Sequence, residues 1–163
     1  MDRLILLRHG KAEADAPTGQ DFDRALTGRG RRDVALVARE LAEAGHAPDL
    51  ALVSPAVRAK ETWEQAAPFF PGAQVEWAPV LYHIDPQGIL DLAFDQTPRA
   101  VMVVGHNPGL GELAAYLARE AGRRPGLIGF PTSAAAVVDF APKGHRRARA
   151  VSIYTPKGLG GGA

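Results

Sequence analysis

Three short segments of the sequence combine histidine and arginine in a way that could bind and transfer a phosphoryl group. They are Arg8-His9-Gly10, Ser54-Pro55 followed by Arg58, and Gly105-His106-Asn107-Pro108. An arginine guanidinium makes two parallel, charge-assisted hydrogen bonds to an oxyanion. A neutral imidazole can attack phosphorus and carry the phosphoryl group as a covalent intermediate, and a second, protonated imidazole can stabilise the transferring oxygens. These residue types therefore indicate phosphoryl transfer.

Each segment directly follows a short, continuously apolar run. The runs span residues 4–7, 50–53 and 100–104. Runs of this kind are typical of strands that are buried on both faces of a parallel sheet. Because ligands bind beyond the carboxyl ends of such strands, we expect two histidines and two arginines to meet at one edge of the sheet.

Two of the segments also carry helix-start signals. Ser54 before Pro55, and Asn107 before Pro108, predict helix N-caps with proline at the first helical position. Each helix would direct free N–H groups and the positive end of its dipole toward the same edge, where an anion is favoured.

The rest of the chain alternates between helical and strand-like patterns. Apolar residues at helical spacing predict helices around residues 34–41, 59–67, 87–94 and 110–121. Strands are predicted at residues 134–140 and 148–154, joined as an antiparallel pair by a turn at residues 142–145. This alternation predicts an α/β fold, a three-layer α/β/α sandwich with a mainly parallel central sheet and an antiparallel edge.

Length and composition limit the class of protein. With 163 residues, 46% hydrophobic and 23% charged, the chain is expected to form a single domain over residues 1–157 with a flexible Gly-rich tail over residues 158–163. The chain contains no cysteine, which excludes disulfides, thiolate zinc sites and cysteine nucleophiles and fits a cytoplasmic protein. The apolar run at residues 4–7 is too short for a signal peptide or a membrane span, so we expect no membrane association.

Charge and motifs give no indication of nucleic acid or metal. The net charge is +1, and the two clusters of basic residues are more typical of a solvated surface than of a binding stripe. These clusters are Arg24, Arg29, Arg31 and Arg32, and Lys143, Arg146, Arg147 and Arg149. The five histidines form no metal-binding pair, and the sequence has no P-loop or dinucleotide fingerprint. We therefore expect no metal or other cofactor.

The chain resembles the histidine phosphatase superfamily. It does so through three motifs in the same order: Leu7-Arg8-His9-Gly10, Ser54-Pro55-x-x-Arg58-Ala59-x-x-Thr62 and Val104-Gly105-His106-Asn107-Pro108. The stretch Asp21-Phe22-Asp23-Arg24-Ala25-Leu26-Thr27-x-x-Gly30 resembles the small SixA-type phosphohistidine phosphatases. The resemblance covers nearly the whole chain and implies a phosphoglycerate mutase-like fold without a large cap.

The resemblance also implies a role for each matching residue. His9 matches the nucleophile, and Arg8 and Arg58 match the arginines that clamp the phosphate. His106 matches the second catalytic histidine, and Arg24 matches an arginine that adds to the clamp.

Two departures from larger relatives concern the phosphate contacts and the proton donor. Residues 11–15 contain no asparagine where many relatives place one against the phosphate. Residues 79–85 offer no obvious match to the carboxylate that serves as the general acid. Asp21 is the first candidate for a proton donor, followed by His83 and Asp85.

These features predict a metal-independent phosphatase that works through a phosphohistidine on His9, with Asn107 contacting the substrate. An imidazole leaves phosphorus far more readily than an alkoxide, so a site without a strong acid favours phosphohistidine on a protein as the substrate. The alternatives are a phosphomonoesterase that acts on a small phosphorylated metabolite and, in another class, a non-catalytic phosphoprotein-binding module. The sequence leaves the oligomeric state open.

Overall fold

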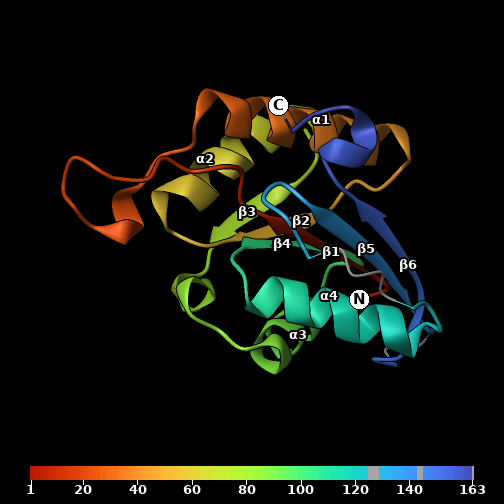
Figure 1. The fold of residues 1–163 in the computed structure, drawn as a ribbon. Helices are drawn as coiled ribbons and strands as arrows, with labels where there is room; N and C mark the ends of the chain where they lie inside the picture. Colours follow the sequence, from red (N-terminus) through yellow and green to blue (C-terminus); the bar gives the residue numbers. More distant parts are fainter. Residues whose placement is uncertain (125–128, 143–144, 163) are drawn as a thin grey trace.

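The computed structural model describes residues 1–124, 129–142 and 145–162. The described residues form a six-stranded sheet in the order β3-β2-β4-β1-β5-β6 (Figure 1). The strands are β1 (Arg3–Arg8), β2 (Leu50–Val53), β3 (Gln74–Trp77), β4 (Ala100–Gly105), β5 (Ala135–Phe140) and β6 (Ala148–Tyr154). Strands β1 to β4 pair in parallel, whereas β5 pairs antiparallel with both β1 and β6. The predicted parallel sheet with an antiparallel edge is confirmed.

Helices cover both faces of this sheet, which gives the three predicted layers. Helices α1 (Gly28–Glu43) and α2 (Val57–Ala66) lie on one face, and α3 (Pro86–Phe94) and α4 (Gly109–Glu120) lie on the other (Figure 1). The resemblance implies a fold without a large cap, and the described residues form none.

The continuous apolar run of β1 follows from its central position. Successive side chains of a strand point to opposite faces. Leu4 and Leu6 accordingly pack in the core beneath α3 and α4, while Ile5 and Leu7 pack in the core beneath α1 and α2. All four side chains are fully buried, and each such burial stabilises the fold by about 1.5–3 kcal/mol.

Three local features differ from the sequence-based expectations. Strand β3 was not predicted, because all four of its residues are exposed at the sheet edge and it lacks an apolar run. Helix α2 begins at Val57 without a side-chain cap, so the prediction that Ser54 caps it is wrong. Helix α4 begins at Gly109 rather than Pro108, although the Asn107 Oδ1 atom still accepts a hydrogen bond of 3.1 Å from the Gly111 N–H group.

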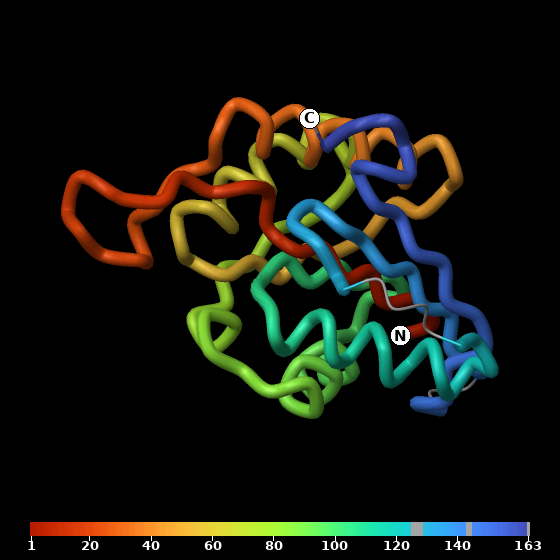
Figure 2. Tube along the Cα trace, viewed as in Figure 1, coloured from red at the N-terminus to blue at the C-terminus, as the bar shows by residue number. Residues whose placement is uncertain are grey.

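The C-terminal segment, residues 157–162, lies against α1 (Figure 2). It forms a short 3-10 helix at Lys157–Leu159, and the Gly162 N–H group donates to Asp33 Oδ1 at 3.0 Å. The turn predicted at residues 142–145 and the predicted tail include Lys143, Gly144 and Ala163, which lie outside the described residues. Within the described ranges, every helix is too short or too polar to cross a membrane.

Candidate active site

The carboxyl ends of β1, β2 and β4 bring the three segments together. Arg8 pairs with Gly105 and Val53 with Val104 in the sheet register. The ladder continues one residue further, because the His9 N–H group donates to the Gly105 carbonyl and the Ser54 N–H group donates to the Val104 carbonyl, each at 3.0 Å. Backbone hydrogen bonds alone therefore fix the segments that begin at His9 and Ser54 relative to β4.

His9 is buried and has one ring nitrogen available for attack. Its Nδ1 atom lies 2.8 Å from the Gly10 carbonyl oxygen, which can only accept, so Nδ1 carries the proton and Nε2 carries the lone pair. The Arg58 Nε atom lies 3.4 Å from that Nε2 atom. Burial, reinforced by the charges of Arg58, Arg8 and Arg24 and opposed by the Gly10 carbonyl, lowers the pKa of His9 to about 4. The imidazole is therefore neutral at neutral pH, as a nucleophile must be.

Two guanidiniums flank this nucleophile, that of Arg58 buried and that of Arg8 half-buried. Arg58 donates from Nη1 to the Asp21 carbonyl at 2.8 Å and from Nη2 to Asp21 Oδ2 at 3.1 Å. Arg8 donates from Nη1 to the Phe130 carbonyl at 3.0 Å, and its buried Nε atom has no partner among the described residues. Burial and the neighbouring Arg58 charge lower the pKa of Arg8. Such an excess of positive charge at a site partly shielded from water favours an anionic ligand.

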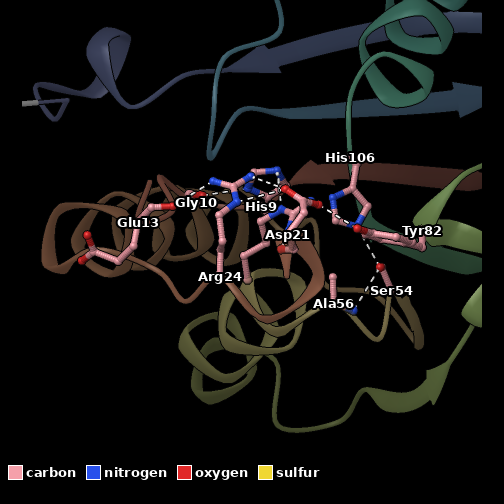
Figure 3. Close-up of polar contacts among 10 residues, drawn as sticks. His9, Gly10, Glu13, Asp21, Arg24, Ser54, Ala56, Tyr82 and His106 are labelled. Carbon is pink, nitrogen blue, oxygen red and sulfur yellow. Dashed lines mark hydrogen bonds and ion pairs between the residues drawn. The ribbon is translucent and has the colours of Figure 1, made fainter. Parts of the chain in front are cut away.

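Asp21 connects the segment after β1 to the rest of the site (Figure 3). Its carboxylate accepts from Tyr82 Oη at 2.7 Å, from Arg24 Nε at 3.0 Å and from Arg58. The hydrogen bond from Tyr82, together with those from Arg24 and Arg58, holds the pKa of Asp21 well below its usual range. Asp21 thus lies at the site but is ionised at neutral pH, so in this arrangement it has no proton to donate.

His106 lies beside His9, with 5.1 Å between the ring centroids. Its Nε2 atom is 2.8 Å from Ser54 Oγ, whereas its buried Nδ1 atom has no partner in the described part of the chain. Burial, followed by the neighbouring His9 and Arg58, lowers the pKa of His106 to about 3. The second imidazole is therefore neutral in this structure. The sequence-based hypothesis considers a protonated ring at this position as the group that stabilises the phosphoryl oxygens.

The remaining candidates have structural partners. Arg24 also donates to the Glu13 carbonyl at 2.8 Å, which anchors it at the rim of the site. Asn107 donates from Nδ2 to the Phe130 carbonyl at 2.8 Å, so its amide is occupied at both ends. Asp85 caps α3 by accepting from the Gly88 N–H group at 2.6 Å.

The His83 ring packs against the Tyr82 ring at a tilt of 53°, near the second imidazole. The ring centroids of the two residues are 4.2 Å apart, and the Tyr82 ring lies 5.6 Å from that of His106. These three residues line part of a cavity of about 380 Å³. In the ranges that the structure covers, no three histidine or acidic side chains are grouped closely enough to hold a metal ion.

Sequence reasoning missed three residues of the site. Ser54 contacts His106 instead of capping a helix. Thr62 Oγ1 accepts from the Gly10 N–H group at 3.0 Å and donates to the Arg58 carbonyl at 2.7 Å, so it ties the nucleophile loop to α2. Thr62 belongs to the second motif, which could have signalled it, whereas the contact of Tyr82 with Asp21 spans 61 residues and has no local signal.

Comparisons with known proteins agree with this geometry. The family model of the histidine phosphatase superfamily (branch 1) matches residues 4–86. A candidate phosphohistidine phosphatase SixA from Agrobacterium tumefaciens is 34% identical with a TM-score of 0.77, over 85% of this chain and 91% of that one. The protein histidine phosphatase SixA in complex with tungstate is 28% identical with a TM-score of 0.73, over 96% of this chain and 99% of that one.

A relative from Arabidopsis thaliana, an uncharacterised chloroplast protein, is 34% identical over 127 residues. The match covers 71% of this chain and 58% of the length of that relative.

Proposed function

The chain belongs to the histidine phosphatase superfamily and is a phosphatase, and we propose that it hydrolyses phosphohistidine on proteins through a covalent intermediate on His9. The observation that carries the proposal is the unprotonated Nε2 atom of His9, held in place by its Nδ1 hydrogen bond and faced by the Arg58 guanidinium.

In the first step, His9 Nε2 attacks the phosphorus atom. A P–Nε2 bond forms and the bond from phosphorus to the substrate imidazole breaks. The substrate ring enters this step already protonated on its other nitrogen, so it leaves as the neutral imidazole. Arg8 and Arg58 bind the oxygens of the transferring group and compensate its charge. The Gly10 carbonyl accepts from Nδ1 and so stabilises the positive charge that develops on the His9 ring.

In the second step, water attacks the phosphorus of phospho-His9. A P–O bond forms, the P–Nε2 bond breaks, and one proton of the attacking water passes to bulk water as inorganic phosphate leaves. His9 is regenerated in its neutral state, which its lowered pKa favours.

The preference for phosphohistidine is supported by the state of Asp21. An alkoxide leaving group needs a proton from a positioned acid, which typically contributes about 10²–10⁴-fold to the rate. Asp21 is ionised and Asp85 caps a helix, so neither carboxylate is arranged as that acid. An imidazole that leaves already protonated has no such need. The likeness to proteins named as phosphohistidine phosphatases supports the same substrate class.

A trapping experiment tests the proposal. The protein would be mixed in EDTA with a ³²P-phosphohistidine protein, quenched in alkali after a single turnover, and examined for label that is stable to base and labile to acid. We expect labelled wild-type chain, no label on His9→Ala, and turnover of phosphohistidine well above that of para-nitrophenyl phosphate.

Other outcomes point to the alternatives. Trapping with a preference for the ester would indicate a small-molecule phosphomonoesterase. Binding of the phosphoprotein without label or turnover would indicate a non-catalytic module. Wild-type turnover in His9→Ala would exclude His9 as the nucleophile.

A further inference from the structure

Ser54 is completely buried between β2 and the second histidine, and its hydroxyl has two neighbours. The Ala56 N–H group lies 3.4 Å from Oγ and can only donate, so it takes one of the oxygen lone pairs. The His106 Nε2 atom is within hydrogen-bond distance of Oγ, at 2.8 Å (Figure 3).

The hydroxyl hydrogen needs an acceptor, because an unpaired buried donor is costly. Among the described residues, His106 Nε2 is the one acceptor within hydrogen-bond distance of Ser54 Oγ. The hydroxyl therefore donates to Nε2, and a neutral imidazole that accepts on Nε2 carries its proton on Nδ1.

We propose that Ser54 is a positioning residue, which fixes His106 as the Nδ1–H tautomer and so makes the neutral imidazole a hydrogen-bond donor to the phosphoryl group. This inference rests on the proposed function of the site. The tautomer matters because a neutral imidazole with its proton on Nε2 would present the Nδ1 lone pair to an anion.

The environment of Nδ1 fits this assignment. The atom is buried and has no partner in the described ranges, so its proton is an unused donor in the ligand-free site. The ring lies 5.1 Å from that of the nucleophile, so a phosphoryl group on His9 would be within reach of it. An oxyanion of that group would satisfy the donor without any prior protonation of the ring.

The backbone explains why a serine at this position can act on His106. The Ser54 N–H group donates to the Val104 carbonyl, so the serine sits one step beyond β2 and beside the end of β4. His106 lies two residues after Val104, and the pair is held by the parallel register rather than by flexible side chains.

Nitrogen-15 spectra of the imidazoles test the tautomer directly. The protein would be labelled with ¹⁵N-histidine, and its five histidines would be resolved in long-range ¹H–¹⁵N correlation spectra near neutral pH, with His106 assigned by the His106→Gln variant. We expect the protonated nitrogen of His106 to be Nδ1, and we expect Ser54→Ala to shift the ring toward the Nε2–H form.

Inorganic phosphate tests the donor role in the same spectra. Saturating phosphate should shift the Nδ1–H resonance of His106 in the wild-type protein. A wild-type ring in the Nε2–H form, a tautomer that is unchanged in Ser54→Ala, or a phosphate complex that leaves Nδ1–H unmoved would each overturn the proposal. These spectra need no turnover, so their failure is distinct from failure of the trapping experiment.

Kinetics provide a second readout. Ser54→Ala should lower kcat by about 10- to 100-fold with little change in KM, as expected when a donor to the transition state is impaired. Ser54→Thr keeps the hydroxyl and should recover most of the rate, whereas Ser152→Ala changes an exposed serine of β6 and should have no effect. Equal losses in folded Ser54→Ala and Ser54→Thr would show that the hydroxyl is not responsible.

Discussion

The Asp21 carboxylate is shared by Arg58, Arg24 and Tyr82. It therefore offsets part of the positive charge that would otherwise face an incoming phosphoryl group. Half of its side chain is exposed, so solvent screens these ion pairs and each contributes little to stability. At the scale of single residues, Asp21 is better described as a competitor for the arginines than as an acid.

Removal of the Asp21 charge should strengthen phosphate binding. In Asp21→Asn the guanidiniums of Arg24 and Arg58 lose a competing anion. We expect the inhibition constant of inorganic phosphate to fall about two- to fivefold, which corresponds to the energy of a screened ion pair. Asp23→Asn removes a charge from the same short 3-10 helix without touching either arginine and is the matched control. Weaker phosphate binding in Asp21→Asn would mean that this carboxylate is needed to hold the guanidiniums in place.

The lowered pKa of His9 predicts an unusual acid limb in the rate profile. Protonation blocks the nucleophile, and with a pKa of about 4 this occurs well below the pH at which an ordinary histidine is protonated. The kcat/KM for para-nitrophenyl phosphate, corrected for ionisation of the substrate, should therefore be nearly level from about pH 7 to about pH 5. A decline centred near pH 6.5 would show that the free enzyme holds His9 in an unperturbed environment.

At the scale of elements, the sequence predicted what burial controls and missed what tertiary contacts control. The runs at β1, β2 and β4 are apolar because both of their faces are covered, so their patterns were sufficient. Strand β3 (Gln74–Trp77) is exposed throughout and has no such pattern. Ser54 has the local signature of a cap, but its hydroxyl contacts a histidine 52 residues away, which no local rule can anticipate.

The start of α1 packs directly on the segment after β1. A Cβ atom at Gly30 would lie 2.3 Å from the Lys11 carbonyl oxygen, whereas at Gly28 the nearest atom would be the flexible end of Arg32 at 3.5 Å. Gly30→Ala should therefore push this segment away from α1 and lower the free energy of unfolding by about 1–3 kcal/mol, the usual range for overpacking. Gly28→Ala is the control and should be neutral or slightly stabilising in urea unfolding. Equal stability of the two variants would contradict this packing.

Thr62 joins two elements through one buried hydroxyl. Thr62→Val keeps the shape but leaves the Gly10 N–H group unpaired, which should cost about 1–3 kcal/mol in the free energy of unfolding. Because Gly10 also orients His9, we expect kcat to fall as well. Thr62→Ser retains both hydrogen bonds and should keep most of the activity. Full activity in Thr62→Val would show that the nucleophile loop holds its position without α2.

At the scale of the whole molecule, the two site histidines lower the free energy of unfolding at acidic pH. His9 and His106 have folded-state pKa values of about 4 and about 3, below the ordinary histidine value that they regain on unfolding. Between these values the unfolded chain binds more protons than the folded one, so the free energy of unfolding must fall as the pH falls. His46, away from the site, contributes in the same direction, because burial lowers its pKa too.

We expect the free energy of unfolding in urea to decrease by about 2 kcal/mol for each site histidine between about pH 7 and about pH 5. His106→Gln cannot titrate and should lose less stability over this range than the wild-type protein, whereas His145→Gln, at an exposed position, should match the wild type. Inorganic phosphate should flatten the slope, because a bound anion favours the protonated imidazoles and so tightens its own binding as the pH falls. A wild-type slope that survives unchanged in both His9→Gln and His106→Gln would locate the acid sensitivity elsewhere. In that case, the burial and the neighbouring arginines that keep His9 neutral would not determine how the free energy of unfolding depends on pH.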